Sequence, residues 1–142
     1  MSIILLQTDT TVGFLSQNSE KLFEIKSRQQ IKPFLKFYKT FQSLKLDLRV
    51  PNSQKNLIRR SKKTTFIVKN QAFRVSSLHL NSQVIRNFIW QYSTSANASG
   101  KKFNRSFCED KSDITIEDKK KLSEKKSSII LKLNEKKIRR LR

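Results

Sequence analysis

The sequence predicts an α/β or α+β fold in which a sheet packs against helices. Strand-like segments alternate with helix-like segments along the chain, a pattern typical of layered folds. The chain has 142 residues, of which 36% are hydrophobic, which is enough to form one core and too little for two ordinary domains. We therefore expect a single domain over residues 1–142.

The first half of the chain carries alternating strand and helix signals. Asn18 is a good N-cap, and Leu22, Phe23 and Ile25 follow it at helical spacing. Pro51 and Asn52 then break the chain. The elements expected here are a strand over 2–7, a helix over 18–26, a strand over 33–38 and a helix over 41–48.

The second half begins with two segments rich in β-branched and aromatic residues, separated by Asn70 and Gln71, which suggests a hairpin. Asn134 and Glu135 form a plausible turn near the C-terminus. The lysine-rich stretch 119–126 is typical of a solvated, mobile loop. The elements expected here are strands over 63–69 and 72–76, a helix over 81–90, and strands over 113–117, 127–133 and 136–141.

The charge of the chain is its strongest compositional signal. Lys and Arg number 31 against 11 Asp and Glu, which gives a formal net charge of +20. Such an excess favours a polyanionic partner or substrate, although it also serves solubility. Charge sign alone does not distinguish RNA from a nucleotide.

Several classes of function are disfavoured by composition. Cys108 has no second cysteine to pair with, and His79 is the single histidine, so neither a disulfide nor a Cys/His zinc site is expected. No apolar run is long enough to span a membrane. The start of the chain reads as a strand rather than a signal peptide, so we expect a soluble, cytoplasmic protein with no membrane partner.

A small polar segment, Ser93-Thr-Ser-Ala-Asn-Ala-Ser-Gly100, is the first candidate for chemistry. If it is extended, the side chains of Ser93, Ser95 and Asn97 project from one face. Gly100 then permits a turn whose backbone amides approach an anion. An ordinary polar loop has the same composition, so the segment alone is weakly informative.

Two further segments carry candidate binding groups. Lys26 and Arg28 share a face if their segment is extended, and the two cations would suit a polyphosphate, although a solvated basic loop is the alternative. Thr8 and Thr10 offer hydroxyls at the end of the first expected strand, and Asp9 is placed to cap a following helix. Walker, Ser-His-Asp and HExxH patterns are absent from the sequence, so catalysis would rest on positioning and electrostatics.

Taken together and in order, the three segments resemble the YrdC/Sua5/YciO/YwlC family, whose hallmarks are P-T-[DE]-T-x-x-G, K-x-R-x-x-x-x-P and S-x-S-A-N-x-S-G. The matching strings are Gln7-Thr-Asp-Thr-Thr-Val-Gly13, Lys26-Ser-Arg-Gln-Gln-Ile-Lys-Pro33 and the segment that ends at Gly100. Shorter and less specific matches to family motifs extend the resemblance over nearly the whole chain. They lie at residues 63–66, 73–75, 127–130 and 138–139.

The resemblance implies a YrdC-like domain: a twisted mixed sheet flanked by helices, with a basic concave surface. It also implies an L-threonylcarbamoyladenylate synthase, a nucleotidyltransferase that converts L-threonine, bicarbonate and ATP to threonylcarbamoyl-AMP and pyrophosphate with Mg²⁺. The product would serve tRNA threonylcarbamoyladenosine modification at adenosine 37, together with other proteins of that modification.

By motif match, the resemblance gives candidate roles to nine residues. Lys26 and Arg28 would be catalytic, and both would bind ATP with Ser95 and Asn97. No residue of the chain is assigned to a metal. The remaining candidates, for threonine and the carbamate, are Thr8, Thr10, Lys32, Arg74 and Ser93.

The chain also departs from the family pattern. Gln7 stands where the family has proline, Phe14 follows Gly13, and a Pro-Gly-Pro-x-Thr run is missing. The chain is short, and no separate C-terminal Sua5 domain is expected. One alternative is a module that binds double-stranded RNA or tRNA with weak or no catalysis, and another is a basic structural protein of the ribosome.

Overall fold

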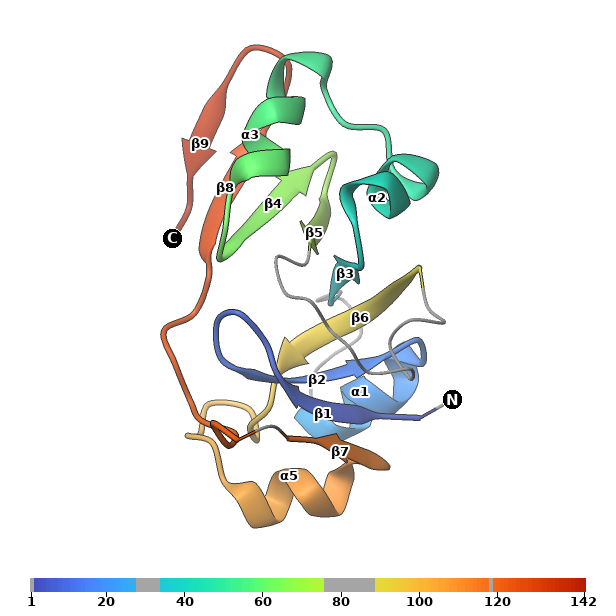
Figure 1. Cartoon of the computed structure of the whole chain (residues 1–142), viewed down its shortest axis with the longest axis vertical. Coiled ribbons are helices and arrows are strands. Elements are labelled where there is room, and N and C mark those ends of the chain that lie inside the picture. Colours follow the sequence, from blue (N-terminus) through green and yellow to red (C-terminus); the bar gives the residue numbers. More distant parts are fainter. Residues whose placement is uncertain (1, 28–33, 76–88, 118) are drawn as a thin grey trace. The chain divides into compact units, whose positions relative to one another are not determined.

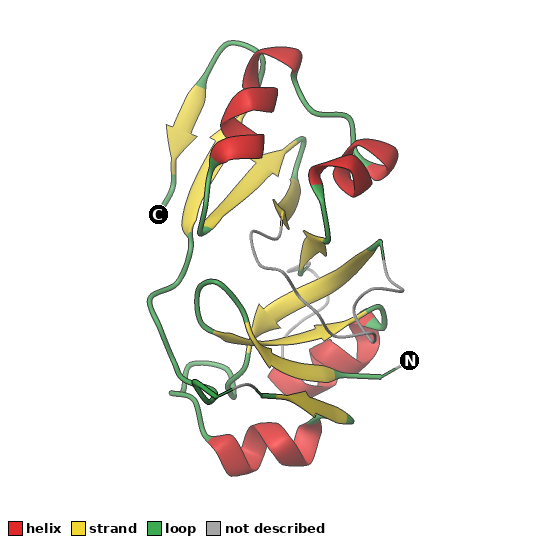
Figure 2. Ribbon diagram, in the orientation of Figure 1, coloured by secondary structure: helices red, strands yellow, loops and turns green. Residues whose placement is uncertain are grey.

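The computed structural model describes residues 2–27, 34–75, 89–117 and 119–142 (Figure 1). Its contacts divide the chain into two compact units. Unit 1 comprises Met1–Phe34 and Gln91–Lys126, and unit 2 comprises Leu35–Trp90 and Ser127–Arg142. Each unit contains both helices and strands (Figure 2), and parallel and antiparallel strand pairs occur in both. The mixed sheet and the α+β class are therefore confirmed.

The strands of unit 1 lie in the order β7, β1, β2 and β6. The pairs β1–β2 and β2–β6 are antiparallel, whereas β1–β7 is parallel. The bounds are Ile4–Gln7 for β1, Val12–Ser16 for β2, Trp90–Ser95 for β6 and Ile114–Ile116 for β7.

One face of this sheet packs against α1 (Ser19–Lys26) and α5 (Arg105–Lys111). Phe14 of β2 and Leu22 of α1 are completely buried in the shared core. Full burial of such a side chain contributes about 1.5–3 kcal/mol. The core therefore fixes α1 on the sheet, and the last residue of that helix is Lys26.

The strands of unit 2 lie in the order β3, β5, β4, β8 and β9. The β4–β5 hairpin turns at Lys69 and Asn70, whose φ angles are +49° and +66°. Positive φ at both central residues is the signature of a type I′ turn, which suits the twist of a hairpin. The bounds are Leu35–Tyr38 for β3, Thr64–Val68 for β4, Gln71–Val75 for β5, Ile129–Leu133 for β8 and Ile138–Arg140 for β9.

The helices of unit 2 are α2 (Phe41–Asp47), a 3₁₀ turn at Asn52–Gln54 and α3 (Lys55–Arg60). Thr40 caps α2, because its Oγ1 accepts a hydrogen bond of 3.0 Å from the amide of Ser43. The unit has its own core, formed by Tyr38, Leu44, Val50, Ile58, Phe66, Val68, Phe73 and Leu133.

Most expected elements are confirmed with ends shifted by a few residues. The helix expected over 81–90 falls largely outside the described residues, and its last residue, Trp90, begins β6 instead. The prediction that Asp9 caps a helix is wrong, because the next element is the strand β2. The single domain over 1–142 stays a prediction.

None of the helices in the described part of the chain combines the length and the apolar character needed to cross a membrane.

Candidate functional site

The ammonium group of Lys26 is the centre of the best-defined polar site. Lys26 is only 3% exposed, and its Nζ donates to the backbone carbonyls of Ser95 and Asn97, each at 2.9 Å. The side-chain oxygens of the same two residues accept as well, Ser95 Oγ at 3.4 Å and Asn97 Oδ1 at shorter range. These four acceptors are formally neutral, so they solvate the buried charge without cancelling it.

The segment after β6 folds around this ammonium through its own hydrogen bonds. Ser95 Oγ donates to Asn97 Oδ1 at 2.8 Å, and Asn97 Nδ2 donates to the carbonyl of Lys101. Ser99 Oγ donates back to the carbonyl of Lys26. Gly100 closes the turn with φ +74°, a conformation that glycine adopts without steric cost. The segment and the end of α1 therefore form one network.

The charge of Lys26 also acts on its surroundings. Burial raises the pKa of the Cys108 thiol, and a backbone hydrogen bond with Asn104 together with the positive charge of Lys26 partly opposes that rise. Cys108 is fully buried in the core of unit 1. The positive charge of Lys26 therefore influences the pKa of a thiol in the core between the sheet and the helices, in addition to its contacts with the polar segment.

Thr8 and Thr10 lie in the loop that joins β1 to β2. Thr8 Oγ1 donates to the carbonyl of Thr11 at 2.6 Å and accepts from the amide of Thr10 at 3.2 Å. The two threonine hydroxyls also lie 3.2 Å apart. Both side chains are buried, so the hydroxyls shape this loop from within.

Gly13 allows the loop to approach the sheet closely. A Cβ atom at this position would lie 3.2 Å from Thr8 Cγ2 and 3.2 Å from the carbonyl oxygen of Thr94. Gly13 pairs with Ser95, and Leu15 pairs with Ser93. Since side chains alternate along a strand, Ser93 and Ser95 project from the same face of the sheet. That face is opposite to the one that carries Phe14 and packs on α1.

Gln91 and Ser93 are the buried polar residues of β6 on this second face. Among the described residues, no hydrogen-bond partner is found for the buried Oε1 atom of Gln91. A buried acceptor of this kind carries a desolvation cost until a donor reaches it. The sequence analysis did not select Gln91, because a single glutamine in a strand carries no motif.

The nine predicted site residues fall into three groups. Thr8, Thr10, Lys26, Ser93, Ser95 and Asn97 belong to unit 1, where Lys26, Ser95 and Asn97 are brought into direct contact. Arg28 and Lys32 lie outside the described residues. Arg74 belongs to unit 2, where it is buried on β5 with its guanidinium carbon 5.9 Å from the centroid of the Phe37 ring.

Two details of the sequence interpretation need correction. Lys26 does not lie in an extended segment, because it occupies the last turn of α1, and Ser27 follows in a left-handed conformation with φ +48°. Asn97 lies beyond the end of β6, and its side chain reaches Lys26 from the segment that follows. The expected common face is therefore confirmed for Ser93 and Ser95 only.

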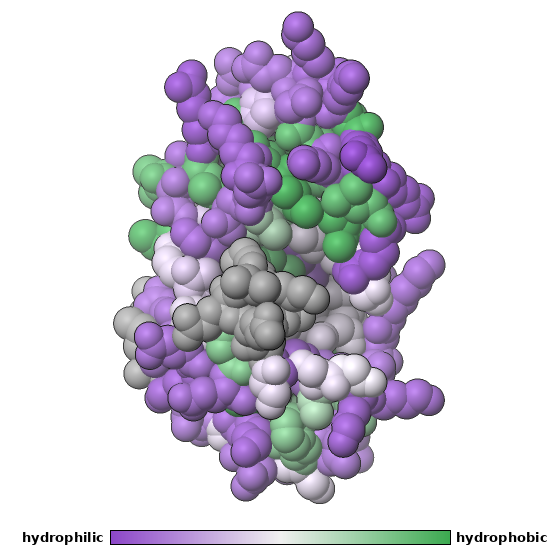
Figure 3. Space-filling view, turned by 180° about the vertical axis from the view of Figure 1, so that it is seen from behind, coloured by the Kyte–Doolittle hydropathy of each residue, from purple (hydrophilic) through white to green (hydrophobic). Residues whose placement is uncertain are grey.

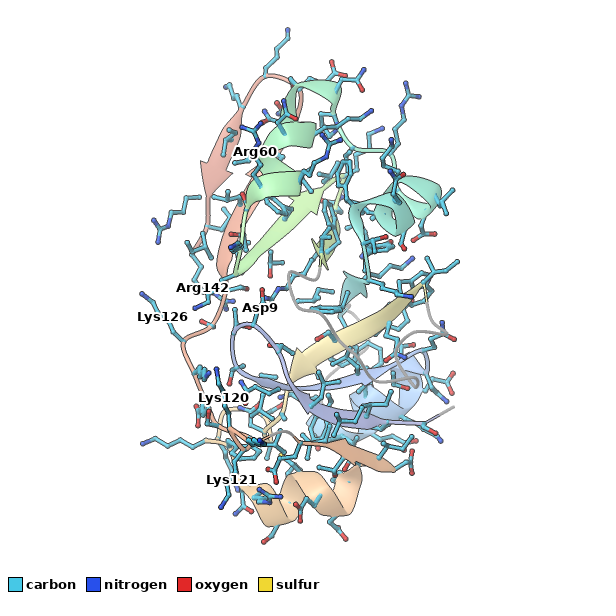
Figure 4. All side chains as sticks on the ribbon, in the orientation of Figure 1. Asp9, Arg60, Lys120, Lys121, Lys126 and Arg142 are labelled. Atoms are coloured by element: carbon cyan, nitrogen blue, oxygen red, sulfur yellow. The ribbon has the colours of Figure 1, made fainter. Side chains whose placement is uncertain are left out.

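The lysine-rich stretch 119–126 is more closely attached than the sequence suggests. The amide of Ser123 donates to Gln7 Oε1 at 2.8 Å, and the amide of Lys125 donates to Thr11 Oγ1 at 3.1 Å. Leu122 is buried in the core of unit 1. The labelled side chains of Lys120 and Lys121 lie on this stretch (Figure 4). The stretch therefore lines the Thr8–Thr11 loop with its backbone and exposes most of its lysines.

The described part of the chain contains no group of three or more His, Cys, Asp or Glu side chains that could hold a metal ion.

An α+β fold with a mixed sheet and a lysine-centred polar segment after one strand defines the class as YrdC-like. The family model for Sua5, YciO and YrdC proteins, which carries the description "Telomere recombination", matches residues 2–142. The chain therefore belongs to this family. Among curated proteins, no significant match is found.

Solved structures share this fold at low sequence identity. YciO of E. coli superimposes with a TM-score of 0.78 at 15% identity, covering 99% of this chain and 82% of that one. Sua5 of P. abyssi, complexed with L-threonine, gives a TM-score of 0.78 at 19% identity. The match covers 99% of this chain and 50% of Sua5, so this chain spans about half the length of that protein.

A third structure, full-length HypF in its phosphate- and nucleotide-bound form, matches with a TM-score of 0.75 at 15% identity. The match covers 99% of this chain and 26% of HypF.

Proposed function

We propose that the chain is a threonylcarbamoyl-AMP synthase of the tRNA modification pathway for threonylcarbamoyladenosine. Its substrates would be L-threonine, bicarbonate and ATP, and a cytoplasmic setting with tRNA and other modification proteins belongs to the same proposal. The observation that carries it is the network of Lys26, Ser95 and Asn97, because the family motifs predict these three residues to act together and they are in direct contact.

The proposed reaction has two steps. The amine of threonine and bicarbonate condense to a carbamate with loss of water. A carbamate oxygen then attacks the α-phosphorus of ATP, the bond from that phosphorus to the bridging oxygen breaks, and pyrophosphate leaves with the negative charge. Catalysis of this kind needs positioned reactants and positive charge near the departing group.

Lys26 is suited to organise the site. Its ammonium has three N–H groups, and four oxygens of Ser95 and Asn97 already surround it. We therefore assign to Lys26 the placement of the Ser95–Asn97 segment together with a long-range positive charge. Arg28 is proposed to make the direct phosphate contact, because its planar fork suits a phosphoryl group.

Ser95 and Asn97 are proposed to line the ATP subsite with Lys26 and Arg28. Thr8, Thr10 and Ser93 lie in the same unit and are proposed, with Lys32, to receive threonine and the carbamate. Arg74 belongs to unit 2, and its role toward threonine stays a prediction. The bound threonine of the similar Sua5 structure and the nucleotide of HypF support these ligand classes. Mg²⁺ is proposed to enter with ATP, whose phosphate oxygens supply ligands that this hard cation prefers.

The direct test is pyrophosphate release from ATP by the purified full chain with Mg²⁺. We expect release that needs both threonine and bicarbonate and that yields AMP derivatives rather than ADP. Reactions without threonine, or with serine in its place, serve as controls. Release that ignores threonine, or no release by protein shown to be folded, would exclude the proposed activity.

A further inference from the structure

The positive charge of the chain is concentrated in unit 2. This unit contains 18 Lys and Arg against two acidic residues, Asp47 and Glu135, for a formal charge of +16. Unit 1 contains 13 Lys and Arg against nine acidic residues, for a formal charge of +4. The two units are nearly equal in length, so the asymmetry is not a matter of size. The proposed synthase site does not account for it, because most of that site lies in unit 1.

Unit 2 carries a groove of about 700 Å³ where three connections of the chain meet. The groove is bordered by the loop after α2, the turn of the β4–β5 hairpin and the β8–β9 hairpin. Five exposed cations line it against the single carboxylate of Glu135, namely Arg49, Lys69, Lys132, Lys137 and Arg139. Within the described part of the chain, none of these five is held in an ion pair.

The base of this groove is apolar. Val50, Val68 and Leu133 line it and are each less than 8% exposed, and they belong to the core of unit 2. On the face drawn in Figure 3, unit 2 also shows hydrophobic surface bordered by strongly hydrophilic side chains. The rim of the groove is cationic and its floor is apolar. Such a groove fits a ligand that has negative charges along one edge and a flat, apolar surface beside them.

A second hollow of about 400 Å³ continues the basic surface. It shares Arg49, Val50 and Glu135 with the groove, and it adds the cations Lys45 and Lys55 together with the carboxylate of Asp47. A single mononucleotide would occupy only part of the surface that the groove and this second hollow form together. A polymer with one negative charge per unit is long enough to reach the cations of both hollows.

We propose that this groove of unit 2 binds single-stranded RNA. The cations along the rim bind successive phosphates of the strand. An unpaired nucleobase packs on the apolar floor of the groove. In an RNA duplex the nucleobases are stacked, and only their edges are exposed in the grooves of the double helix. A duplex therefore has no flat nucleobase face to bury in this protein groove. This binding does not rest on the proposed synthase activity and takes place without ATP.

The test measures binding of a fluorescein-labelled oligouridylate about twelve nucleotides long to the full chain by fluorescence anisotropy. The groove variant combines Arg49→Gln, Lys132→Gln and Arg139→Gln. The matched control combines Arg60→Gln, Lys62→Gln and Arg140→Gln, which removes the same charge from exposed positions of unit 2 outside the groove. Arg140 follows Arg139 on β9, so the two side chains point to opposite faces.

We expect the groove variant to bind about tenfold more weakly, and the control to stay within about threefold of the parent, in roughly 50–200 mM salt. The slope of log affinity against log salt should fall in magnitude by about 2, because each phosphate contact with a single strand contributes about 0.7. Equal losses in both variants would overturn the groove as the site. Tighter binding of a duplex of the same length would overturn the single-stranded assignment, and equal competition by poly-glutamate would overturn RNA as the ligand.

Amide chemical shifts of the unmodified chain provide a second, independent measurement. On addition of the oligouridylate, we expect the largest shifts at Lys69, Asn70 and Leu133, with little change at Arg60 and Lys62. Shifts confined to unit 1 would overturn the proposal. Pyrophosphate release is recorded on the same variants and should be unchanged, so failure of RNA binding and failure of the synthase are distinguishable.

Discussion

The ammonium of Lys26 donates to the backbone carbonyl of Asn97 at 2.9 Å and also to its side-chain amide oxygen. One cation at the end of α1 therefore holds both the main chain and the side chain of a residue 71 positions later. Hydrogen bonds from a charged donor contribute about 1.5–3 kcal/mol, more than neutral ones. This contact fixes the segment that the family motif identifies as S-x-S-A-N.

Asn97→Ala is expected to destabilise unit 1. The substitution removes the acceptor shared by Lys26 and Ser95 and the donor to the carbonyl of Lys101. We expect a loss of about 1–3 kcal/mol in the free energy of unfolding, measured by urea denaturation. Asn56→Ala is the matched control, since Asn56 is exposed and, among the described residues, its side chain accepts a single long hydrogen bond of 3.5 Å, from Arg59. Equal losses in the two variants would show that the Asn97 network contributes nothing of its own.

Lys26→Met is expected to abolish threonine-dependent pyrophosphate release. The methionine fills similar space but removes the charge and leaves the oxygens of Ser95 and Asn97 without their donor. Lys26→Arg keeps the charge, yet its planar fork does not match four acceptors around one nitrogen, so we expect a rate reduced by about tenfold or more. Thermal unfolding of both variants is measured in parallel, with Lys111→Met as the exposed control on α5. Full turnover by Lys26→Met would contradict the role of this residue.

Local signals allowed much of the fold to be predicted from the sequence. Asn18 was expected to cap the first helix, and its side chain accepts from the amide of Lys21 at 3.2 Å. Asn134 was expected in a turn, and its Oδ1 accepts from the amides of Lys136 and Lys137. In both cases the side chain forms a hydrogen bond with a backbone amide no more than three residues away. The local sequence alone therefore predicts the interaction.

Elements that depend on distant contacts were missed. β2 (Val12–Ser16) contains Gly13, which weakens a strand signal, and this glycine is required by the approach of Thr8 and Thr94 rather than by its neighbours in sequence. The helices α3 and α5 have only six and seven residues, and the apolar residues of each are adjacent in sequence, whereas those of the comparably short α2 lie at helical spacing. Short elements of this kind are stabilised by tertiary packing.

In the candidate site, too, local sequence motifs were predictable and features that depend on distant contacts were not. The family motifs placed Lys26, Ser95 and Asn97 in one predicted site, and the structure brings the three into contact. The sequence pattern gave no indication that neutral oxygens of Ser95 and Asn97 surround the ammonium. Gln91 was not selected, because its burial depends on how β6 is covered in three dimensions. The network of contacts therefore supports the role that we propose for Lys26, which is to place the Ser95–Asn97 segment, over direct contact with phosphate.

Acid unfolding is expected to involve Asp47. Its pKa is lowered, first by the hydrogen bond from the Tyr38 hydroxyl and then by Lys36, while burial acts in the opposite direction. Because the folded-state pKa is below the unfolded value of about 3.9, the carboxylate stabilises the fold above that pH. This contribution is lost as the pH falls through the folded-state pKa.

The test compares acid titrations followed by tryptophan fluorescence. Tyr38→Phe removes the largest cause of the shift, so the unfolding midpoint should move to higher pH, and Asp47→Asn should abolish this part of the pH dependence. Asp110→Asn on α5 is the exposed control. An unchanged acid midpoint in Tyr38→Phe would exclude the Tyr38 contact as the cause.

Gln7→Ala is expected to loosen the lysine-rich stretch. Gln7 occupies the family's proline position, and its Oε1 accepts from the amide of Ser123 at 2.8 Å. Its Nε2 also donates to the carbonyls of Thr8 and Thr10 at 3.4 Å. We expect trypsin to cleave within residues 119–126 several times faster in the variant, as resolved by mass spectrometry of early fragments. Gln42→Ala, at an exposed position of α2, should leave the cleavage rate unchanged.

The two glycines should respond differently to substitution, because their environments differ. Gly13→Ala places a Cβ 3.2 Å from Thr8 Cγ2 and 3.2 Å from the Thr94 carbonyl, so the loop or β6 must move. We expect a loss of about 1–3 kcal/mol, typical of overpacking. Gly100 has open space but φ +74°, so Gly100→Ala should cost about 1 kcal/mol through backbone strain alone. Gly100→Asn should cost less than Gly100→Ala, because asparagine tolerates the left-handed region. Urea denaturation of the three variants measures the order, and a smaller loss for Gly13→Ala than for Gly100→Asn would show that β6 yields to the added methyl group.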